Sequence, residues 1–363
     1  MEATRLLLTP IFKEIICKNL SFEDLVRFRD AFKLPSLKCS ISVIDPITHR
    51  EITLPGVNQI TINAYALIKH YGLNNALLAA AETGQNPIVQ TLLKAGANVD
   101  TVDQDGETAL MKAAQNGYDS IVQTLIVNKA NTEIVNVNAM TALMKASLTG
   151  RNSVVQILIA NKANIEAADN FGWTSLMLAA DTGHDSVVQT LIKARANIEA
   201  ADNSGWTSLM LAADNGYDSV VKILIAAEAN IEAADQNGKT ALMAAAADDH
   251  DSVVKILIEA EANIEAADQN GKTALILAAE KGQNEVVKTL IEAKANIEAI
   301  DIFMWTALML AASNGHESVV KTLIEAGADI KATIQDGYTA LTIAAENGHE
   351  SVVQILKEAG AQE

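Results

Sequence analysis

Four of the six histidines are the first residues to consider for catalysis or metal binding. They are His184, His250, His316 and His349, and multiples of 33 residues separate them. A metal site needs three or four ligands that converge on one point, whereas this spacing distributes the side chains along the molecule. We therefore expect each of them to be a packed or hydrogen-bonded loop residue. The sequence shows no Cys-x-x-Cys, phosphate-binding loop or Ser/His/Asp arrangement, so we predict no cofactor, no metal, no catalytic residue and no enzyme activity.

The aromatic residues follow the same spacing and indicate a different chemistry. The three tryptophans, Trp173, Trp206 and Trp305, are separated by multiples of 33 residues, and Tyr338 continues the series. Aromatic residues make up only 4% of the chain, yet six of the eight after residue 72 lie in short turn-like segments. Trp and Tyr are enriched among the residues that dominate protein–protein binding energy. These side chains are therefore candidates for contact with a partner protein.

The elements that position these residues form a repeat of 33 residues. The phrase Thr-Ala-Leu-Met, or a close variant, begins at Thr108, Thr141, Thr174, Thr207, Thr240, Thr273, Thr306 and Thr339. A degenerate copy at residues 75–78 brings the number of repeats to nine, from about residue 70 onward. In the fifth repeat, Thr207 is a good N-cap for a short helix through Ala213, Gly216 ends that helix, and Ser219 opens a second helix with an apolar face. One helix pair cannot bury its apolar face alone, but stacked copies can.

This pattern resembles the ankyrin repeat, which runs Asp-x-x-Gly-x-Thr-Pro-Leu-His-x-Ala-Ala, then Gly-His, then Val-Val-x-Leu-Leu. The resemblance covers about residues 70–363 and implies an all-α fold, an ankyrin-type solenoid of stacked helix pairs with finger-like β-turns. The Pro and His of the family turn are replaced here by Ala or Ser and by Met, Leu, Ile or Thr.

A second departure concerns the glycine near the end of the second helix, which remains only as Gly96, Gly327 and Gly360. The other repeats have Lys129, Lys162, Arg195, Glu228, Glu261 and Lys294 in its place. If these residues adopt a positive φ, each costs roughly 1 kcal/mol relative to glycine. The middle repeats are then expected to be less stable than the ends.

The resemblance implies that a partner protein binds the row of turns, here called fingers, and the concave side beside them. Each finger has five residues of the type Asp-x-x-Gly-x, and its second, third and fifth positions vary. The predicted contact residues on the fingers are Met140, Phe171, Trp173, Trp206, Phe303, Trp305 and Tyr338. The sixth and seventh fingers are polar and have lysine at the fifth position. The alternative interpretation is that the rings pack across adjacent fingers and only cover backbone.

Charge divides the chain into two parts. The chain has 45 acidic and 27 basic residues and a net charge of −18, but residues 1–72 carry a net +2 and the repeats −20. This acidity argues against nucleic acid as a partner. One glutamate recurs at the same repeat position, as Glu133, Glu166, Glu199, Glu232, Glu265 and Glu298, and we interpret this series as a solvated surface. Asp181 and Asp214 lie near the tryptophan fingers, where a basic partner is an alternative to simple solvation.

Residues 1–36 are predicted to form a small helical N-terminal head. Its apolar residues Leu8, Phe12, Ile16, Leu20, Leu25 and Phe28 have a spacing similar to that of the F-box, over about 26 residues. Pro10 stands one place late, and Asp30 and Phe32 depart from the pattern. The resemblance implies that these six residues bind the Skp-type linker of a cullin-type ubiquitin ligase while the repeats select a substrate. The alternative is that the head is a helical cap on the first repeat.

The expected organisation is therefore a head at 1–36, a connecting part at 37–72, and nine repeats at 73–363. In the connecting part, residues 41–45 and 51–54 predict a hairpin, and residues 62–71 predict a helix. Cys17 and Cys39 are too few for a disulfide framework, and no apolar run is long enough to span a membrane.

We expect a cytoplasmic, monomeric protein-interaction module that serves as a ligase adaptor, or alternatively a plain scaffold or inhibitor. Chains that join an F-box to ankyrin repeats resemble host-directed proteins of intracellular bacteria and large viruses, so delivery into a host cell is one expectation for the location.

Overall fold

A computed structural model of the chain describes residues 40–44, 51–55 and 59–362. The chain divides into two compact units, residues 1–164 and residues 165–363. The repeats in both units consist of helices, and the first unit also contains one two-stranded hairpin.

The hairpin and one helix precede the repeats. Strands β1 (Ser40–Ile44) and β2 (Glu51–Pro55) pair antiparallel, which confirms the predicted hairpin. Helix α3 (Gln59–Tyr71) confirms the helix predicted for residues 62–71 and begins three residues earlier. It buries alanine and leucine side chains and packs against both helices of the first repeat, α4 (Leu73–Glu82) and α5 (Asn86–Lys94). A helical cap on the first repeat is therefore present, and α3 provides it.

The first unit continues with two further helix pairs. Their bounds are α6 (Ala109–Asn116), α7 (Asp119–Val127), α8 (Ala142–Leu148) and α9 (Asn152–Ala160). The first helices α4, α6 and α8 pack side by side in sequence order, and the second helices α5, α7 and α9 do the same. Each repeat therefore contacts its immediate neighbours, as in a solenoid.

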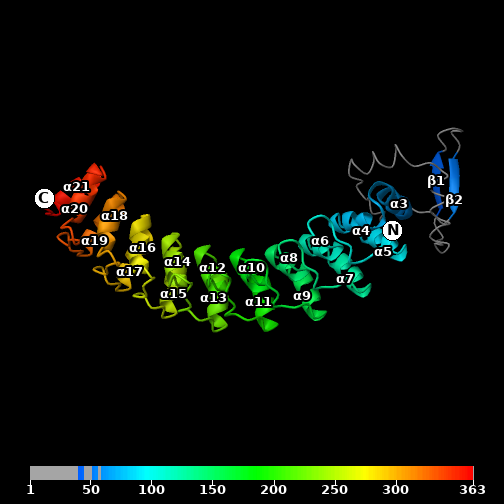
Figure 1. The fold of residues 1–363 in the computed structure, drawn as a ribbon, viewed down its shortest axis with the longest axis horizontal. Coiled ribbons are helices and arrows are strands. Elements are labelled where there is room, and N and C mark those ends of the chain that lie inside the picture. The colour runs from blue at the N-terminus through cyan, green and yellow to red at the C-terminus, as the bar shows by residue number, and fades with distance from the viewer. Residues whose placement is uncertain (1–39, 45–50, 56–58, 363) are drawn as a thin grey trace, which may run out of the picture. The chain divides into compact units, whose positions relative to one another are not determined.

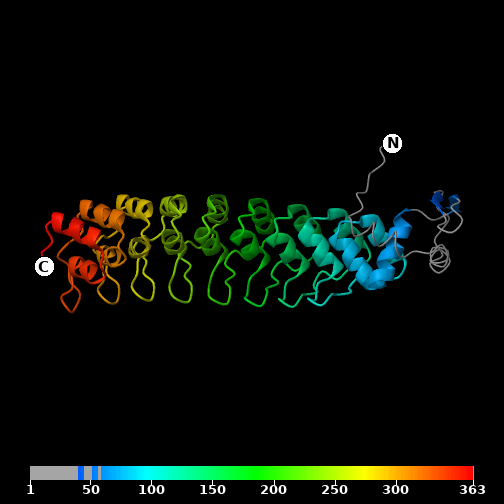
Figure 2. The same ribbon diagram turned by 90° about the horizontal axis from the view of Figure 1, so that it is seen from above.

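The second unit contains six helix pairs stacked in the same way (Figure 1). They are α10 (Ser175–Asp181), α11 (Asp185–Lys193), α12 (Ser208–Asp214), α13 (Asp218–Ala226), α14 (Ala241–Ala247), α15 (Asp251–Glu259), α16 (Ala274–Lys281), α17 (Asn284–Glu292), α18 (Ala307–Ser313), α19 (Glu317–Glu325), α20 (Ala340–Glu346) and α21 (Glu350–Glu358). Figure 2 shows that the connecting loops of this unit project from one side of its helices. These loops are the predicted fingers.

Threonine caps begin the first helices. Thr207 Oγ1 accepts a hydrogen bond from the backbone N–H of Met210 at 3.4 Å, and all eight repeat threonines cap their helices in this way. The cap satisfies an amide that has no partner within the helix. Gly216 follows α12 with a φ of 72°, which glycine adopts without steric penalty. The predicted cap and stop are confirmed.

The core lies between the two layers of helices. Each first helix buries its Ala-Leu or Ser-Leu pair and following apolar residues. The second helices bury a leucine and a Val-Val or Ile-Val pair, except that α21 buries only Val352 of its pair. This is the 3.6-residue periodicity expected of amphipathic helices. Among the helices that the structure describes, none is long and apolar enough to cross a bilayer.

Candidate partner-binding site

Six fingers are held by an aspartate carboxylate at the first position, and the third finger by the amide oxygen of Asn136. In the fifth finger, Asp202 Oδ1 accepts hydrogen bonds from the backbone N–H groups of Ser204 and Trp206, both at 2.8 Å. Gly205 at the fourth position has a φ of 90° and its N–H donates to the Asp202 carbonyl at 3.0 Å. This is the turn chemistry typical of Asp followed by Gly. It fixes the direction in which the variable second, third and fifth side chains project.

Backbone hydrogen bonds join neighbouring fingers. The N–H of the second finger residue donates to the carbonyl of the third residue in the preceding finger. In the second unit these bonds are Asn203 to Phe171 at 2.9 Å, Gln236 to Ser204 at 3.0 Å, Gln269 to Asn237 at 2.7 Å and Ile302 to Asn270 at 2.9 Å. Each of these four bonds follows a glycine at the fourth position of the preceding finger, where a Cβ would crowd the amide: at Gly205 it would lie 3.0 Å from the Gln236 nitrogen.

Trp173 and Trp206 are tied to the finger that follows each of them. The indole N–H of Trp173 donates to Asp202 Oδ2 at 3.1 Å, and that of Trp206 donates to Asp235 Oδ2 at 3.2 Å. The Lys239 ammonium lies 4.9 Å from the centre of the Trp206 ring, a cation–π contact. Both rings are half-buried. These two tryptophans therefore stabilise the array of fingers.

Trp305 differs from the other two tryptophans. The first position of the next finger, which supplies the acceptor for the indoles of Trp173 and Trp206, is occupied by Ile334. An isoleucine side chain cannot accept a hydrogen bond. Earlier fingers have Asp103, Asn136, Asp169, Asp202, Asp235, Asp268 and Asp301 at that position. Within the part of the chain that the structure describes, the Trp305 indole N–H makes no hydrogen bond. The half-buried Trp305 ring therefore retains an available donor.

Apolar side chains project into solvent from the same finger. Ile302 is 59% exposed, Phe303 66% and Met304 39%, and Ile300 just before the finger is 50% exposed. We refer to these four residues and Trp305 as the eighth-finger patch. A groove of about 540 Å³ adjoins the patch. It is lined by Asn270, Lys272, Glu280, Asp301, Phe303, Trp305, Leu310, Ser313 and Asn314.

Comparison with known proteins identifies the fold. A family model described as ankyrin repeats (3 copies) matches residues 77–169, 110–202, 164–235, 209–301 and 297–363. The chain belongs to the ankyrin-repeat family. No curated protein matches the chain. The predicted ankyrin-type solenoid of stacked helices is confirmed, and ankyrin repeats are generally protein–protein interaction modules rather than enzymes.

The predicted contact residues of the ankyrin fingers differ in accessibility. Phe171 is 69% exposed and Tyr338 is 36% exposed, like the residues of the eighth-finger patch. Met140 is only 8% exposed, because its side chain contributes to the core of the first unit. Met140 is therefore removed from the candidate contact surface.

Two predicted acidic contacts already have partners inside the ankyrin array. Burial raises the pKa of Asp181, although Asn215 donates a hydrogen bond to its carboxylate at 3.0 Å and opposes the shift. Burial also raises the pKa of Asp214, which the Lys239 charge at 3.2 Å lowers and the neighbouring Asp248 raises further. Raised pKa values mean that their surroundings disfavour the charged form, so neither carboxylate is a freely solvated anion.

The spaced histidines His250, His316 and His349 are hydrogen-bonded loop residues, as predicted. Nε2 of His250 lies 2.8 Å from the Asp214 carbonyl, Nε2 of His316 3.0 Å from the Glu280 carbonyl, and Nε2 of His349 2.9 Å from the Ser313 carbonyl. A carbonyl only accepts, so each ring donates through Nε2. The imidazoles close the first helix of the preceding repeat, and among the described residues no His, Cys, Asp or Glu group could hold a metal ion.

The recurring glutamates link the ankyrin repeats and are not only a solvated surface. Although their side chains are exposed, Glu166 Oε1 accepts a hydrogen bond from the Asn197 backbone N–H at 2.9 Å. The same bond runs from the next repeat to Glu133, Glu199, Glu232, Glu265 and Glu298. The six side chains are exposed, as the interpretation expected, but that interpretation missed the bond to an amide 31 residues away, which only stacking brings near.

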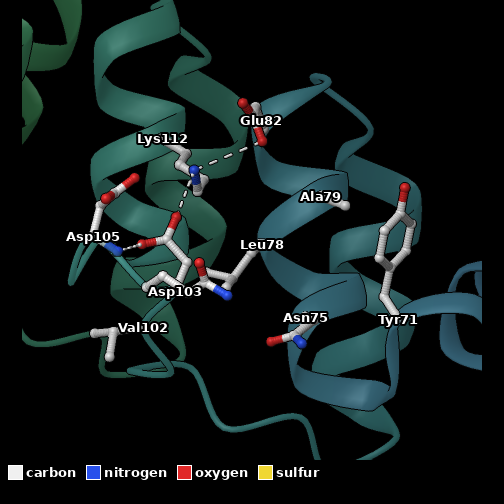
Figure 3. Close-up of a pocket in the computed structure, with 10 residues that line it drawn as sticks. Tyr71, Asn75, Leu78, Ala79, Glu82, Val102, Asp103, Asp105 and Lys112 are labelled. Carbon is white, nitrogen blue, oxygen red and sulfur yellow. Dashed lines mark hydrogen bonds and ion pairs between the residues drawn. The ribbon is translucent and has the colours of Figure 1, made fainter.

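A second groove, of about 700 Å³, lies in the first unit and contains no predicted contact residue (Figure 3). Its wall includes Tyr71, which is 42% exposed, and Lys112, whose ammonium lies 2.9 Å from Asp103 and 3.7 Å from Glu82. Burial alone would raise the pKa of Asp103, but Lys112 lowers it overall. Among the described residues of the lining, Lys112 is the one basic residue, whereas Glu82, Asp103 and Asp105 are acidic, so the groove keeps a net negative charge.

The six predicted ligase-linker residues Leu8, Phe12, Ile16, Leu20, Leu25 and Phe28 lie outside the described residues, as does Cys39. The family match begins at residue 77. The F-box-like role of the head stays a prediction.

Proposed function

We propose that this protein binds a partner protein through its fingers and the adjoining concave face, with the eighth-finger patch as the main contact. The observation that supports the proposal is the exposure of Ile302 and Phe303, at 59% and 66%, on one finger. Contiguous exposed apolar side chains are uncommon on monomeric proteins and are typical of interaction sites. The polar sixth and seventh fingers show that the fold itself does not require such residues.

The backbone of the eighth finger supports the same conclusion. Met304 has a φ of 65°, at the position where six of the other fingers of the array have glycine with positive φ. A long side chain in the left-handed region is strained by roughly 1 kcal/mol. Because Met304 is 39% exposed, core packing does not explain why a methionine occupies this strained position. Contact of its side chain with a partner would explain it.

Trp173 and Trp206 contribute mainly to the array, since their indoles bind Asp202 and Asp235. Their rings are half-buried, so any contact that they make with a partner is secondary to that of the exposed Phe171. The predicted preference for a basic partner rests on the overall charge of −18 rather than on Asp181 or Asp214, whose carboxylates have internal partners.

The decisive experiment is quantitative affinity capture from a cytosolic extract with the full chain and a double variant, Ile302→Gln with Phe303→Gln. Both side chains are largely exposed, so the variant should unfold at the same denaturant concentration as the unmodified chain. We expect capture of the specific partner to fall at least tenfold. A matched control is Val127→Gln, which removes an 81% exposed apolar residue from the first unit and should leave capture unchanged. Undiminished capture by the double variant would refute the proposal.

The role of ubiquitin-ligase adaptor is a second candidate, which the spacing of Leu8, Phe12, Ile16, Leu20, Leu25 and Phe28 favours. Its test is a pull-down of the full chain with the Skp-type linker. Binding that is lost on Leu25→Asp would support the adaptor. Absence of binding would leave a plain scaffold or inhibitor, in which the repeats act without the ligase.

A further inference from the structure

The hydrogen bonding between fingers stops after the eighth finger. The second residue of the fifth, sixth, seventh and eighth fingers donates its N–H to the preceding finger. In the ninth finger, the Gln335 N–H makes no such bond, and the Phe303 carbonyl accepts none within the described residues. The Trp305 indole N–H also lacks an acceptor there. Three hydrogen-bonding groups that are used internally in other fingers are therefore available between these two.

Met304 and Ile334 account for different parts of this interruption. A Cβ at the fourth finger position would lie 3.0 Å from the amide nitrogen of the next finger at Gly205 and Gly271, and Met304 places a Cβ there, so the backbone bond is lost. Ile334 removes the acceptor of the Trp305 indole. In the other fingers of the second unit, the first residue is an aspartate whose Oδ1 anchors its own turn. In two of them Oδ2 also accepts from a tryptophan indole. An isoleucine side chain can do neither. The Ile334 N–H still donates to the Tyr338 carbonyl at 3.1 Å, and the Gly337 N–H to the Ile334 carbonyl at 2.9 Å. The ninth finger thus keeps its turn but is not tied to its neighbour.

We propose that the space between the eighth and ninth fingers binds an extended peptide segment of the partner protein, which completes the interrupted hydrogen bonding. A backbone N–H of the segment donates to the Phe303 carbonyl, and a backbone carbonyl accepts from Trp305 Nε1. This inference rests on the proposed function and specifies the chemistry of the partner. Recognition of this kind draws its affinity from main-chain hydrogen bonds and its specificity from alternate side chains.

The side chains around the gap define what the segment carries. Ile302 and Phe303 present apolar surface beside it, so the side chain that faces them is apolar. Lys272 lines the adjoining groove but is paired with Glu280 at 2.7 Å. Asp301 is buried and anchors its own turn, so a charge preference of the segment rests on the net charge of −18. The segment is therefore apolar at its centre with lysine or arginine at its ends.

Two substitutions at one position separate this proposal from a structural effect. Ile334→Asp restores the turn anchor and places Oδ2 where Asp235 accepts from Trp206. Ile334→Asn restores the same anchor, as Asn136 does in the third finger at 3.0 and 2.9 Å. However, Asn136 directs its Nδ2 to the fifth residue of the preceding finger, Glu107, at 3.4 Å. An asparagine at 334 would therefore present a donor to Trp305 and leave the indole N–H available.

The probe is a phage-displayed library of random twelve-residue peptides, selected on the full chain with counterselection on Ile334→Asp. Enriched peptides are synthesised and titrated against the full chain and both variants, with detection of the three tryptophan indole resonances by NMR. We expect apolar sequences with basic ends that shift the Trp305 resonance more than the other two. Ile334→Asp should weaken binding at least tenfold, and Ile334→Asn less than twofold. The titrations are repeated at 0.5 M salt. A difference between the two variants that persists there does not arise from the added charge of the aspartate, because salt would screen that effect.

Three outcomes would overturn the proposal. They are failure to enrich any peptide over the counterselection, equal weakening by both variants, and equal binding to all three proteins. Unfolding midpoints of the variants are measured in parallel, and both are expected to match or exceed that of the unmodified chain. None of these outcomes affects the proposed function, which the capture experiment with Ile302→Gln and Phe303→Gln tests separately.

Discussion

Six non-glycine residues that follow second helices of the ankyrin repeats adopt the left-handed conformation, and we expect them to lower the stability of their repeats. Lys129, Lys162, Arg195, Glu228, Glu261 and Lys294 have φ between 64° and 70°, as the repeat alignment predicts. In the fifth repeat, the Glu228 N–H donates to the Ile225 carbonyl at 2.9 Å, and the Ala229 N–H donates to the Leu224 carbonyl at 3.1 Å. This pair of bonds is a Schellman motif, which prefers glycine at the position of Glu228. Replacing the six residues with glycine should stabilise the array.

The magnitude follows from two opposing terms. Release of left-handed strain contributes roughly 1–2 kcal/mol per residue, and the greater freedom of glycine in the unfolded chain offsets about 0.4–1 kcal/mol. All six side chains are exposed, so no packing is lost. The net gain is about 0.5–1 kcal/mol per position and roughly 3–6 kcal/mol for all six if the sites add. Glu228→Gly should gain more than Lys294→Gly, because a carboxylate near a helix C-terminus is unfavourable by about 0.3–1 kcal/mol.

The assay is guanidinium unfolding followed by circular dichroism, with the midpoint as the readout because repeat arrays need not unfold in one step. The reverse change, Gly327→Ala, is the control. Gly327 has a φ of 93°, and no heavy atom lies within 4 Å of the place that the alanine methyl would take, so its loss of stability reports the backbone alone. An unchanged or lower midpoint for the sixfold variant, at an unchanged slope, would refute the reasoning.

Two further predictions concern an acidic pair and two buried hydroxyls. Asp248→Asn should raise stability by roughly 0.5–1 kcal/mol at pH 7, because an amide in place of the carboxylate donates to Asp214 instead of repelling it. The folded-state pKa of Asp214 is raised, so this gain is present at neutral pH and disappears as the pH falls through that pKa; thermal unfolding at pH 3 and pH 7 checks it. Ser175→Ala and Ser208→Ala should each stabilise the chain by about 1 kcal/mol, since both hydroxyls are buried without a partner, and denaturant midpoints that fall would contradict this.

Features that lie within one repeat could be predicted from the sequence. The spacing of the threonines, the glycines after the first helices, and the apolar faces all act through local geometry that every copy repeats. Thr207, Gly216 and the start of α13 are therefore found within a residue of their predicted places. The left-handed φ at Glu228 and its equivalents was predictable for the same reason.

Contacts between repeats could not be predicted in this way. Glu166 meets the Asn197 amide, and Trp206 meets Asp235, only after the helix pairs have stacked. A position in the repeat also does not determine burial, since Met140 is 8% exposed while Trp206 at the equivalent place is half-buried. The fifth finger position therefore identified the residues that face neighbouring fingers, but not which of them remain available to a partner.

Because Trp173 and Trp206 have a structural role, the missing acceptor of Trp305 indicates that this tryptophan has a different role. If indoles on the fingers served the array alone, each would be expected to have its acceptor in the next finger, and the series of aspartates from Asp169 to Asp301 would continue. The series instead ends at Ile334, next to the most exposed apolar finger of the second unit. A repeat array provides its own controls, because each finger shows what its neighbours would look like without a special role. A single substitution at position 334 can therefore distinguish the contribution of Trp305 to the stability of the array from its contribution to partner binding.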